Sequence, residues 1–321
     1  MNGTSAFDAV YELDLWNDGG LGSGSGPGSS LEATRTISAL LVHLILTMNL
    51  KSMLDVPCGG MRWMPSVIET ADDLYQVDGL LPFNFRRGAG AGDPPAGAFQ
   101  YTGVDIVGSV VNSARARHGA AHPMWEFIHG DVTMPSLLLS RHDLVVCRDL
   151  FFHLSAPKIA AAIANFRRSG STWLLASHNP HMSENSEALA WRAGAGVAPQ
   201  RLPPGFAGGL DEGGYRPVNL LLPPYNLPPP VWQYMEWLQP EGTQPDGSEA
   251  AAWDKAVAFW RIDTLEGIET LENMLEASGV PPPTAPPHTP LLLALHLLLQ
   301  ICYYFLDGKD FFFKSLLTAL Q

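Results

Sequence analysis

Strand-like apolar runs that end in an acidic residue constrain the fold of this chain more than any other feature. The acids at these ends are Asp55, Asp105, Asp131 and Asp149. Helix-like segments separate the runs, and alternating strands and helices form right-handed crossovers and a parallel sheet. The four carboxylates would then lie along the carboxyl-terminal edge of one sheet, where open α/β sheets bind ligands. Any one of these acids is equally explained as a helix cap or turn former.

The spacing of the apolar residues predicts an α/β fold, a Rossmann-like doubly wound sheet with helices on both faces, followed by an irregular C-terminal extension. Residues 232–238 are read as a strand or a short helix, and 250–277 as helical. Further strands are expected at 52–56, 101–107, 125–132, 142–149 and 171–177, and helices at 31–50, from 64 onward, at 110–117 and at 156–168.

Glycine- and proline-rich stretches divide the chain. We predict an N-terminal cap segment over 1–30, a main domain over 31–240, and an extension of unknown role over 241–321. Within the main domain, about 71–98 is read as a flexible insertion and about 211–230 as a proline-rich lid.

The charge balance argues against nucleic acid as a partner. The formal net charge is -13, from 19 Lys and Arg against 32 Asp and Glu, whereas a nucleic-acid surface needs cations that neutralise phosphates. The pairs Arg86-Arg87 and Arg167-Arg168 are read as solvated charges.

Three widely spaced cysteines without a CxxC motif fit a reducing compartment. The N-terminus lacks a basic region followed by an apolar core, so a cytoplasmic location is expected. The apolar run 291–306 falls short of the roughly 20 residues of a membrane-spanning helix. No transmembrane span is predicted, and a docked or membrane-surface helix is favoured there. The oligomeric state stays open.

The turn after the first strand is built from small residues. The chain reads LDVPCGG from Leu54 to Gly60. Small residues let the backbone approach a bound molecule closely, and Asp55 can hold a positively charged or hydroxylated ligand.

Several blocks, in order, carry a resemblance to a known family. The chain resembles class I S-adenosylmethionine-dependent methyltransferases, and closely the group whose turn reads LDVPCG followed by Trp63-Met64. The resemblance extends from Phe7 to about Pro230, and makes 31–240 the methyltransferase domain. Its other blocks are the aromatic segment with its Ser/Gly run at 11–30, YTGVDI at 101–106, CRDLFFHLS at 147–155, GGYRPVNL at 213–220 and PPYN at 223–226.

The resemblance assigns the methionine half of the cofactor to the first turn. Asp55 would approach the amino group of the methionine, directly or through water. Cys147 and Arg148 would line the floor beneath the sulfonium. The turn residues that would contact the methionine portion are Pro57, Cys58, Gly59 and Gly60.

The adenosine half would bind at the next two strand ends. Asp105, followed by Ile106, would accept hydrogen bonds from the two ribose hydroxyls, a task suited to an acceptor-only carboxylate. Asp131 would bind the adenine amino group, and Val132 would donate its backbone amide to the ring.

For catalysis, a methyl group on sulfonium is already activated, so alignment and a base are what the protein must add. His153 is the preferred base, with Asp149 and His178 as further candidates, and a structural role for His153 is equally open. Tyr215 and Arg216 are the expected substrate-binding residues. Asp149 with Asn179 has the topology of a metal pair, but no third acidic ligand is identifiable and no metal is predicted.

The sequence therefore predicts an enzyme that transfers a methyl group from S-adenosylmethionine to an oxygen or nitrogen of a small-molecule or sugar acceptor. A nicotinamide-dependent oxidoreductase is the alternative, although the turn has no GxGxxG. A non-catalytic methyltransferase-like binding protein is the third reading, suggested by the insertion and the unfamiliar tail.

Overall fold

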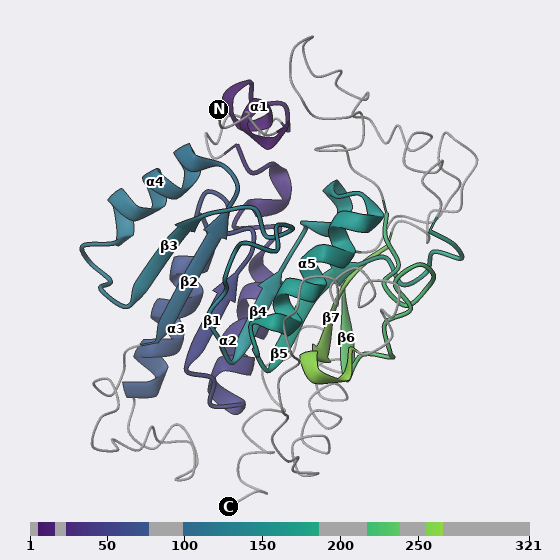
Figure 1. The fold of residues 1–321 in the computed structure, drawn as a ribbon. Coiled ribbons are helices and arrows are strands. Elements are labelled where there is room, and N and C mark those ends of the chain that lie inside the picture. The colour runs from purple at the N-terminus through teal and green to yellow at the C-terminus, as the bar shows by residue number, and fades with distance from the viewer. Residues whose placement is uncertain (1–5, 17–23, 77–98, 186–216, 238–253, 266–321) are drawn as a thin grey trace, which may run out of the picture. The chain divides into compact units, whose positions relative to one another are not determined.

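The computed structural model describes residues 6–16, 24–76, 99–185, 217–237 and 254–265. These residues all lie in one compact unit, Met1–Pro283. They form a sheet of seven strands in the order β3-β2-β1-β4-β5-β7-β6 (Figure 1). The strands are β1 Ser52–Asp55, β2 Gln100–Asp105, β3 Trp125–His129, β4 Leu144–Cys147, β5 Trp173–His178, β6 Trp232–Trp237 and β7 Lys255–Arg261.

Strands β1 to β5 pair in parallel, as predicted. Strand β7 is antiparallel to both neighbours and lies between β5 and β6. The expectation of a helix over 250–277 is therefore wrong for the described residues 254–265. Val257 and Phe259 pack into one core while Ala258 and Trp260 pack into the other, and burial on both faces favours a central strand over a helix.

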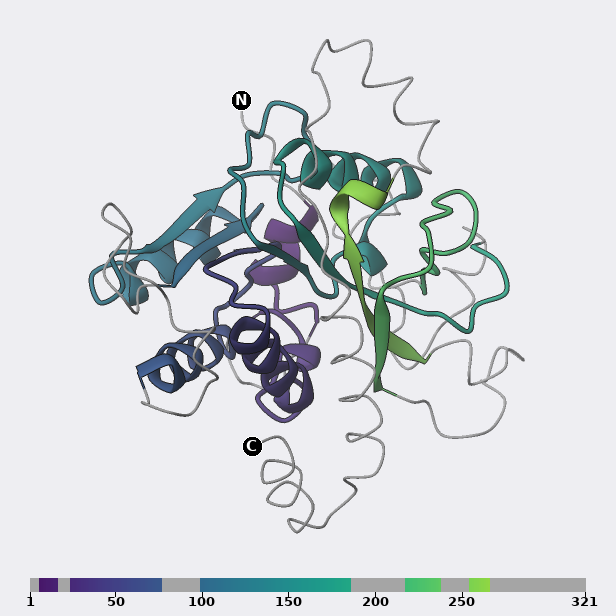
Figure 2. The ribbon, with the colours of Figure 1, turned by 90° about the horizontal axis from the view of Figure 1, so that it is seen from below.

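Helices cover both faces of the sheet. Alternate residues of β4 separate the two layers, because Leu144 and Val146 pack with one core and Val145 and Cys147 with the other. Figure 2 shows α2 and α3 on one side of the central strands and α5 on the other. The helices are α1 Ala6–Glu12, α2 Arg35–Thr47, α3 Met64–Gln76, α4 Gly108–His118 and α5 Ala156–Arg168, with 3-10 turns at Pro27–Ser29, Phe151–His153 and Ile262–Thr264.

Some element boundaries differ from the sequence-based ones. The helix expected over 31–50 is shorter, Arg35–Thr47, and is preceded by turns. Residues 71–76, assigned to an insertion, continue α3, because Ala71 is fully buried one turn after Val67 and Ile68. The segment 232–238 was open between strand and helix, and its described residues Trp232–Trp237 form strand β6.

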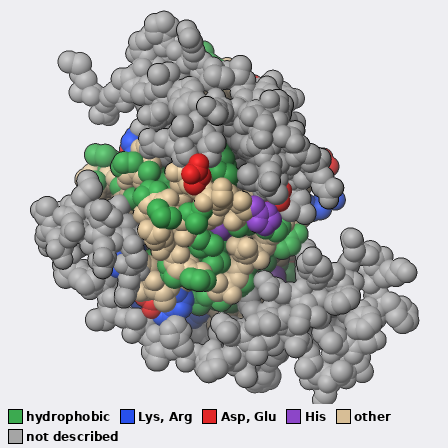
Figure 3. All heavy atoms as spheres, turned by 90° about the vertical axis from the view of Figure 1, so that its right-hand side faces the viewer, with side chains coloured by type: hydrophobic (Ala, Val, Ile, Leu, Met, Phe, Trp, Pro, Cys, Tyr) green, Lys and Arg blue, Asp and Glu red, His purple; other side chains and the backbone are tan. Residues whose placement is uncertain are grey.

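On the side of β6 and β7, the described surface is mostly apolar or uncharged (Figure 3). The charged side chains of Glu236 and Lys255 on these strands are instead largely buried, with 2% and 14% of their surfaces exposed. Among the described helices, none combines the length and the apolar character needed to cross a membrane. The predicted substrate residues Tyr215 and Arg216 and the apolar run 291–306 lie outside the described residues.

Candidate active site

Two adjoining pockets open at the carboxyl ends of the parallel strands. One encloses about 400 Å³ beside β2 and β3, and the other about 850 Å³ beside β1 and β4; part of each volume is open to solvent. The pockets share one wall, which is formed by Phe7, Pro57, Asp105, Ile106 and Leu150.

The turn after β1 is held tightly against β2. The Cys58 amide donates to the Val104 carbonyl oxygen at 2.9 Å. A side chain at Gly103 would place its Cβ 2.9 Å from the Cβ of Cys58, so glycine permits this close approach. Gly59 has a φ of 53°, in the left-handed region that glycine adopts without strain. The turn therefore presents backbone, with little side-chain bulk, to the larger pocket.

Asp55 lies at the base of the larger pocket and is nearly fully buried, with 4% of its surface exposed. The Tyr101 hydroxyl donates to its Oδ2 at 2.8 Å. Burial raises the pKa of Asp55 to about 7, although the hydrogen bond from Tyr101 acts in the opposite direction. A carboxylate in this setting gains most from a ligand that brings positive charge.

Asp105 joins the two pockets. Its Oδ2 accepts a hydrogen bond from the Gly59 amide and its Oδ1 accepts one from the Val107 amide, both at 3.0 Å. Burial raises the pKa of Asp105 to about 6, against the lowering effect of these backbone hydrogen bonds. An ionised carboxylate offers about four acceptor positions, so Asp105 can also receive ligand hydroxyls.

The raised pKa of Asp55 predicts pH-dependent stability and binding. Because the folded pKa exceeds the unfolded value, its stabilising contribution is full below pH about 4 and is lost as the pH rises through about 7. A cationic amino group would favour the ionised form, so cofactor affinity should rise about tenfold per pH unit from pH 5.5 to 7. Thermal unfolding of the ligand-free protein and calorimetric titration with S-adenosylhomocysteine measure the two effects.

The Asp55→Asn variant is the control for this prediction. It should bind more weakly and should flatten both pH profiles, because the amide does not titrate. Profiles that keep their slope in the variant would assign the titration to another group, such as Asp105.

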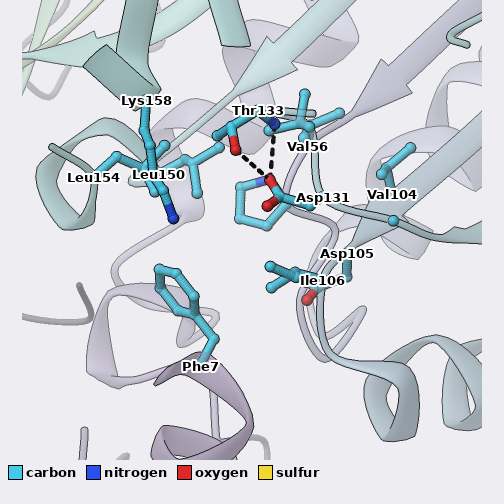
Figure 4. A pocket seen from close by; sticks show the side chains of 13 residues that line it. Phe7, Val56, Val104, Asp105, Ile106, Asp131, Thr133, Leu150, Leu154 and Lys158 are labelled. Atoms are coloured by element: carbon cyan, nitrogen blue, oxygen red, sulfur yellow. Dashed lines mark hydrogen bonds between the residues drawn. The ribbon is translucent and has the colours of Figure 1, made fainter. Parts of the chain in front are cut away.

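The smaller pocket is bounded by the loop after β3. Oδ1 of Asp131 accepts hydrogen bonds from the Thr133 amide at 2.8 Å and the Thr133 hydroxyl at 2.7 Å. These bonds, drawn in Figure 4, fix the carboxylate at the side of the pocket. Val132 and Ile106 supply apolar surface.

A group of four charges with largely buried side chains, which we call the charge quartet, lies at one wall of the larger pocket. It consists of Arg148, Asp149, Glu236 and Lys255. The Arg148 Nε donates to Glu236 Oε1 at 2.7 Å, and its Nη1 lies 3.1 Å from Asp149 Oδ2. The Lys255 Nζ lies 3.0 Å from Asp149 Oδ2 and 3.1 Å from Glu236 Oε2. The two positive and two negative charges thus balance.

The quartet determines the ionisation of Asp149. Burial alone would raise its pKa, but Arg148 and Lys255 outweigh burial and hold the pKa of Asp149 well below its usual range. A carboxylate that stays ionised and paired is a poor proton acceptor. Asp149 lines the larger pocket, and its lowered pKa weighs against the predicted role of this residue as a base.

His153 lines the same pocket from the 3-10 turn Phe151–His153. Its ring packs on Trp16, with centroids 4.7 Å apart and planes tilted by 30°. Trp16 comes from the N-terminal segment, so that segment positions the candidate base.

The N-terminal segment also contacts the first turn. The hydroxyls of Tyr11 and Ser25 are 2.8 Å apart, and the Gly60 amide donates to the Ser25 Oγ at 2.9 Å. Tyr11, Trp16 and Ser25 line the larger pocket. Sequence reasoning proposed a cap segment over 1–30 but assigned none of these residues to the site. The aromatic residues within 7–16 were the sequence feature that could have indicated a contribution of this segment to the site.

The structure brings most of the predicted site residues together. Cys147 is different, because it is fully buried in the core and offers no exposed surface to a ligand. His178 is also fully buried, and burial lowers its pKa to about 4. The predicted residues that line the two pockets are Asp55, Pro57, Cys58, Gly59, Gly60, Asp105, Ile106, Asp131, Val132, Arg148, Asp149 and His153.

Asn179 has structural partners in place of a metal. Its Oδ1 accepts from the Val218 amide at 2.9 Å and its Nδ2 donates to the Asp254 carbonyl oxygen at 3.1 Å. Within the described ranges, no group of three or more His, Cys, Asp or Glu residues is arranged to hold a metal ion.

The sheet order, with five parallel strands and the antiparallel pair β7 and β6 at one edge, defines a Rossmann-like α/β fold with its site at the strand ends. The predicted fold class is confirmed. Residues 88–170 match the family model described as a methyltransferase domain, in agreement with the class expected from the sequence, an S-adenosylmethionine-dependent methyltransferase.

The comparison with curated proteins finds no match. One similar solved structure is the N-methyltransferase NodS from Bradyrhizobium japonicum WM9 with S-adenosylhomocysteine, at 13% identity over 79% of this chain and 98% of that chain, with a TM-score of 0.45. Another is the magnesium protoporphyrin IX methyltransferase ChlM from Synechocystis PCC 6803, at 15% identity over 71% and 82%, with a TM-score of 0.39. A protein from Pyrococcus horikoshii OT3 matches at 19% identity over 47% of this chain and 60% of that chain, with a TM-score of 0.33.

Proposed function

We propose that this protein transfers a methyl group from S-adenosylmethionine to an oxygen or nitrogen of a small-molecule acceptor, and that it belongs to the LDVPCG-type group. The observation that carries the proposal is the placement of Asp55, Asp105 and Asp131 along two adjoining pockets at successive strand ends. Their order along the sheet edge, from β1 through β2 to the loop after β3, is the order of an amino group, a ribose and a purine in the cofactor.

The residues present fit this cofactor. Asp55 is a buried carboxylate that gains from a positive charge, and it would hold the methionine amino group. Asp105 would receive the two ribose hydroxyls at its remaining acceptor positions, and Asp131 with the Val132 amide would hold the adenine edge. The backbone of the Cys58–Gly60 turn would contact the methionine portion, and Arg148 would lie beside the methyl-transfer region. When bound, S-adenosylmethionine supplies the activated methyl group.

The acceptor side would be the aromatic part of the larger pocket. Tyr11, Trp16, Trp63 and His153 line it, and Arg148 lies over the Trp63 ring, 5.7 Å from its centroid. Because the charges of the quartet balance, they create little net electrostatic field in this part of the pocket. The aromatic wall therefore offers mainly flat apolar surface to an acceptor. Such a wall favours a planar or weakly polar acceptor over a highly charged one.

The proposal is tested by cofactor titration followed by an assay of S-adenosylhomocysteine release across sugars, small phenols, amines and peptides. Binding of S-adenosylmethionine with turnover on one acceptor class supports it. Binding of NAD in its place would favour the oxidoreductase alternative. Binding of neither would favour a non-catalytic protein.

His153→Gln should lower kcat by about a hundredfold, because it removes a general base that contributes about 10²–10⁴-fold. Cofactor affinity should stay within about twofold, and the acidic limb of the pH–rate profile should disappear. His122→Gln is the matched control. The His122 ring also stacks on a tryptophan, Trp125, with the ring centroids 3.8 Å apart, but His122 is not among the residues that line the pockets. If His153→Gln keeps the wild-type pH profile, His153 is structural.

A further inference from the structure

The smaller pocket contains a cation for which the roles above give no use. Lys158 lines it, and the other ionisable residues among its described lining are the acids Asp105 and Asp131. Lys158 belongs to the first turn of α5, directly after Ala156 and Pro157. The positive end of the helix dipole lies at this turn and disfavours a lysine.

The walls of this pocket are apolar and approach from two directions. Phe7 comes from α1, and Leu150 and Leu154 come from the loop after β4. Figure 4 shows the Phe7 ring and the Lys158 ammonium pointing toward the same space, with Ile106 and Asp131 on its other side. A space with apolar faces and polar groups at its margin suits a flat heteroaromatic ring.

The hydrogen-bonding groups of adenine leave a defined place for Lys158. The exocyclic amino group donates, and the ring nitrogens N1 and N7 on either side of it accept. Asp131 can only accept when ionised, whereas Lys158 can only donate. If the amino group binds Asp131 and N1 binds the Val132 amide, N7 is the neighbouring acceptor that remains.

We propose that Lys158 donates a hydrogen bond to N7 of the adenine and that Phe7 covers one face of the ring. This inference rests on the proposed function, because it names further residues of the same cofactor site. Residues of the helices α1 and α5 would then recognise the adenine, in addition to the residues at the strand ends.

The test is a double-mutant cycle between Lys158 and N7. Wild type and Lys158→Met are titrated by calorimetry with S-adenosylhomocysteine and with its 7-deaza and 3-deaza analogues. For wild type, the 7-deaza analogue should bind about tenfold more weakly than the parent, because a hydrogen bond to a charged donor is lost. Lys158→Met should weaken the parent by a similar factor and the 7-deaza analogue by less than about twofold, a non-additive result. The 3-deaza analogue should behave like the parent.

Three further variants complete the design. Lys158→Arg keeps the donors and should recover most of the affinity. Phe7→Leu should weaken all three ligands equally, because stacking does not depend on N7. Lys51→Met removes the same charge from an exposed position immediately before β1 and should leave all affinities unchanged.

Losses that add independently, or a Lys158→Met variant with wild-type affinity, would overturn the role of Lys158 while leaving the cofactor assignment intact. Failure of wild type to bind S-adenosylhomocysteine at all would instead overturn the proposed function. Thermal unfolding of each variant separates lost binding from lost folding, and Lys158→Gln replaces Lys158→Met if the latter does not fold.

Discussion

Replacing Asp105 with alanine should weaken binding of S-adenosylhomocysteine by at least about a hundredfold. Two hydrogen bonds from ribose hydroxyls to a carboxylate are lost, at about 1.5–3 kcal/mol each. The variant also removes the acceptors of the Gly59 and Val107 amides, so the first turn loses an anchor on β2. Calorimetric titration at pH 7.5 measures the change.

Asp143→Ala is the matched control for this variant. Asp143 also accepts two backbone amides, from Lys51 at 2.6 Å and Ser52 at 3.1 Å, but at the opposite end of β1. Its loss should lower stability and leave cofactor affinity within about twofold. Unchanged affinity in Asp105→Ala would exclude the ribose assignment.

The second large effect is expected at the charge quartet. Lys255→Met should lower the free energy of unfolding by about 3–5 kcal/mol, because removing one partner leaves a buried charge uncompensated. Asp149 and Glu236 would then share Arg148 alone. Urea denaturation at pH 7 measures the loss.

The pH dependence of the quartet supplies a second readout. Because the folded pKa of Asp149 is depressed, its contribution to stability is present above the unfolded pKa and is lost as the pH falls toward the folded value. Lys255→Met should therefore lose less stability than wild type on acidification below pH 4. The double variant Lys255→Met/Glu236→Gln restores charge balance and should recover much of the loss. A single variant as stable as wild type would contradict the quartet as a stabilising unit.

The parallel part of the sheet could be predicted from the sequence because each strand carries its own signal. A short apolar run such as Leu144–Cys147 is buried on both faces, and an acid or small turn marks its end. Strand β7 carried no such signal. Its run lies in a stretch also readable as a helix, and its partner β5 is distant along the chain, with Leu174 opposite Trp260. Only tertiary pairing decides between the two structures.

The site also divides into residues that carry a local sequence signal and contacts that depend on tertiary packing. Asp55, Asp105 and Asp131 were expected at one edge because strand ends in a parallel sheet meet there, and the resemblance supplied their cofactor roles. The structure places them in the lining of two adjoining pockets. The contacts made by residues from other elements were not predicted. Arg148 finds Glu236 across 88 positions of sequence, and Lys158 approaches from the start of a helix that was expected but given no function. Such contacts depend on how whole elements pack, which no local pattern encodes.

The position of β7 between β5 and β6 determines how much of the chain is needed to form the complete sheet. A fragment that stopped at residue 240 would keep β5 but lack β7, so one backbone edge of β5 would be unpaired. This edge carries Leu174, Leu175 and Ala176, which are fully buried in the intact protein. An exposed apolar edge strand is a template for aggregation. The smallest unit that can fold with a complete sheet therefore extends at least through Arg261. The same strand, β7, pairs with β5 and places the charged side chain of Lys255 beside Asp149.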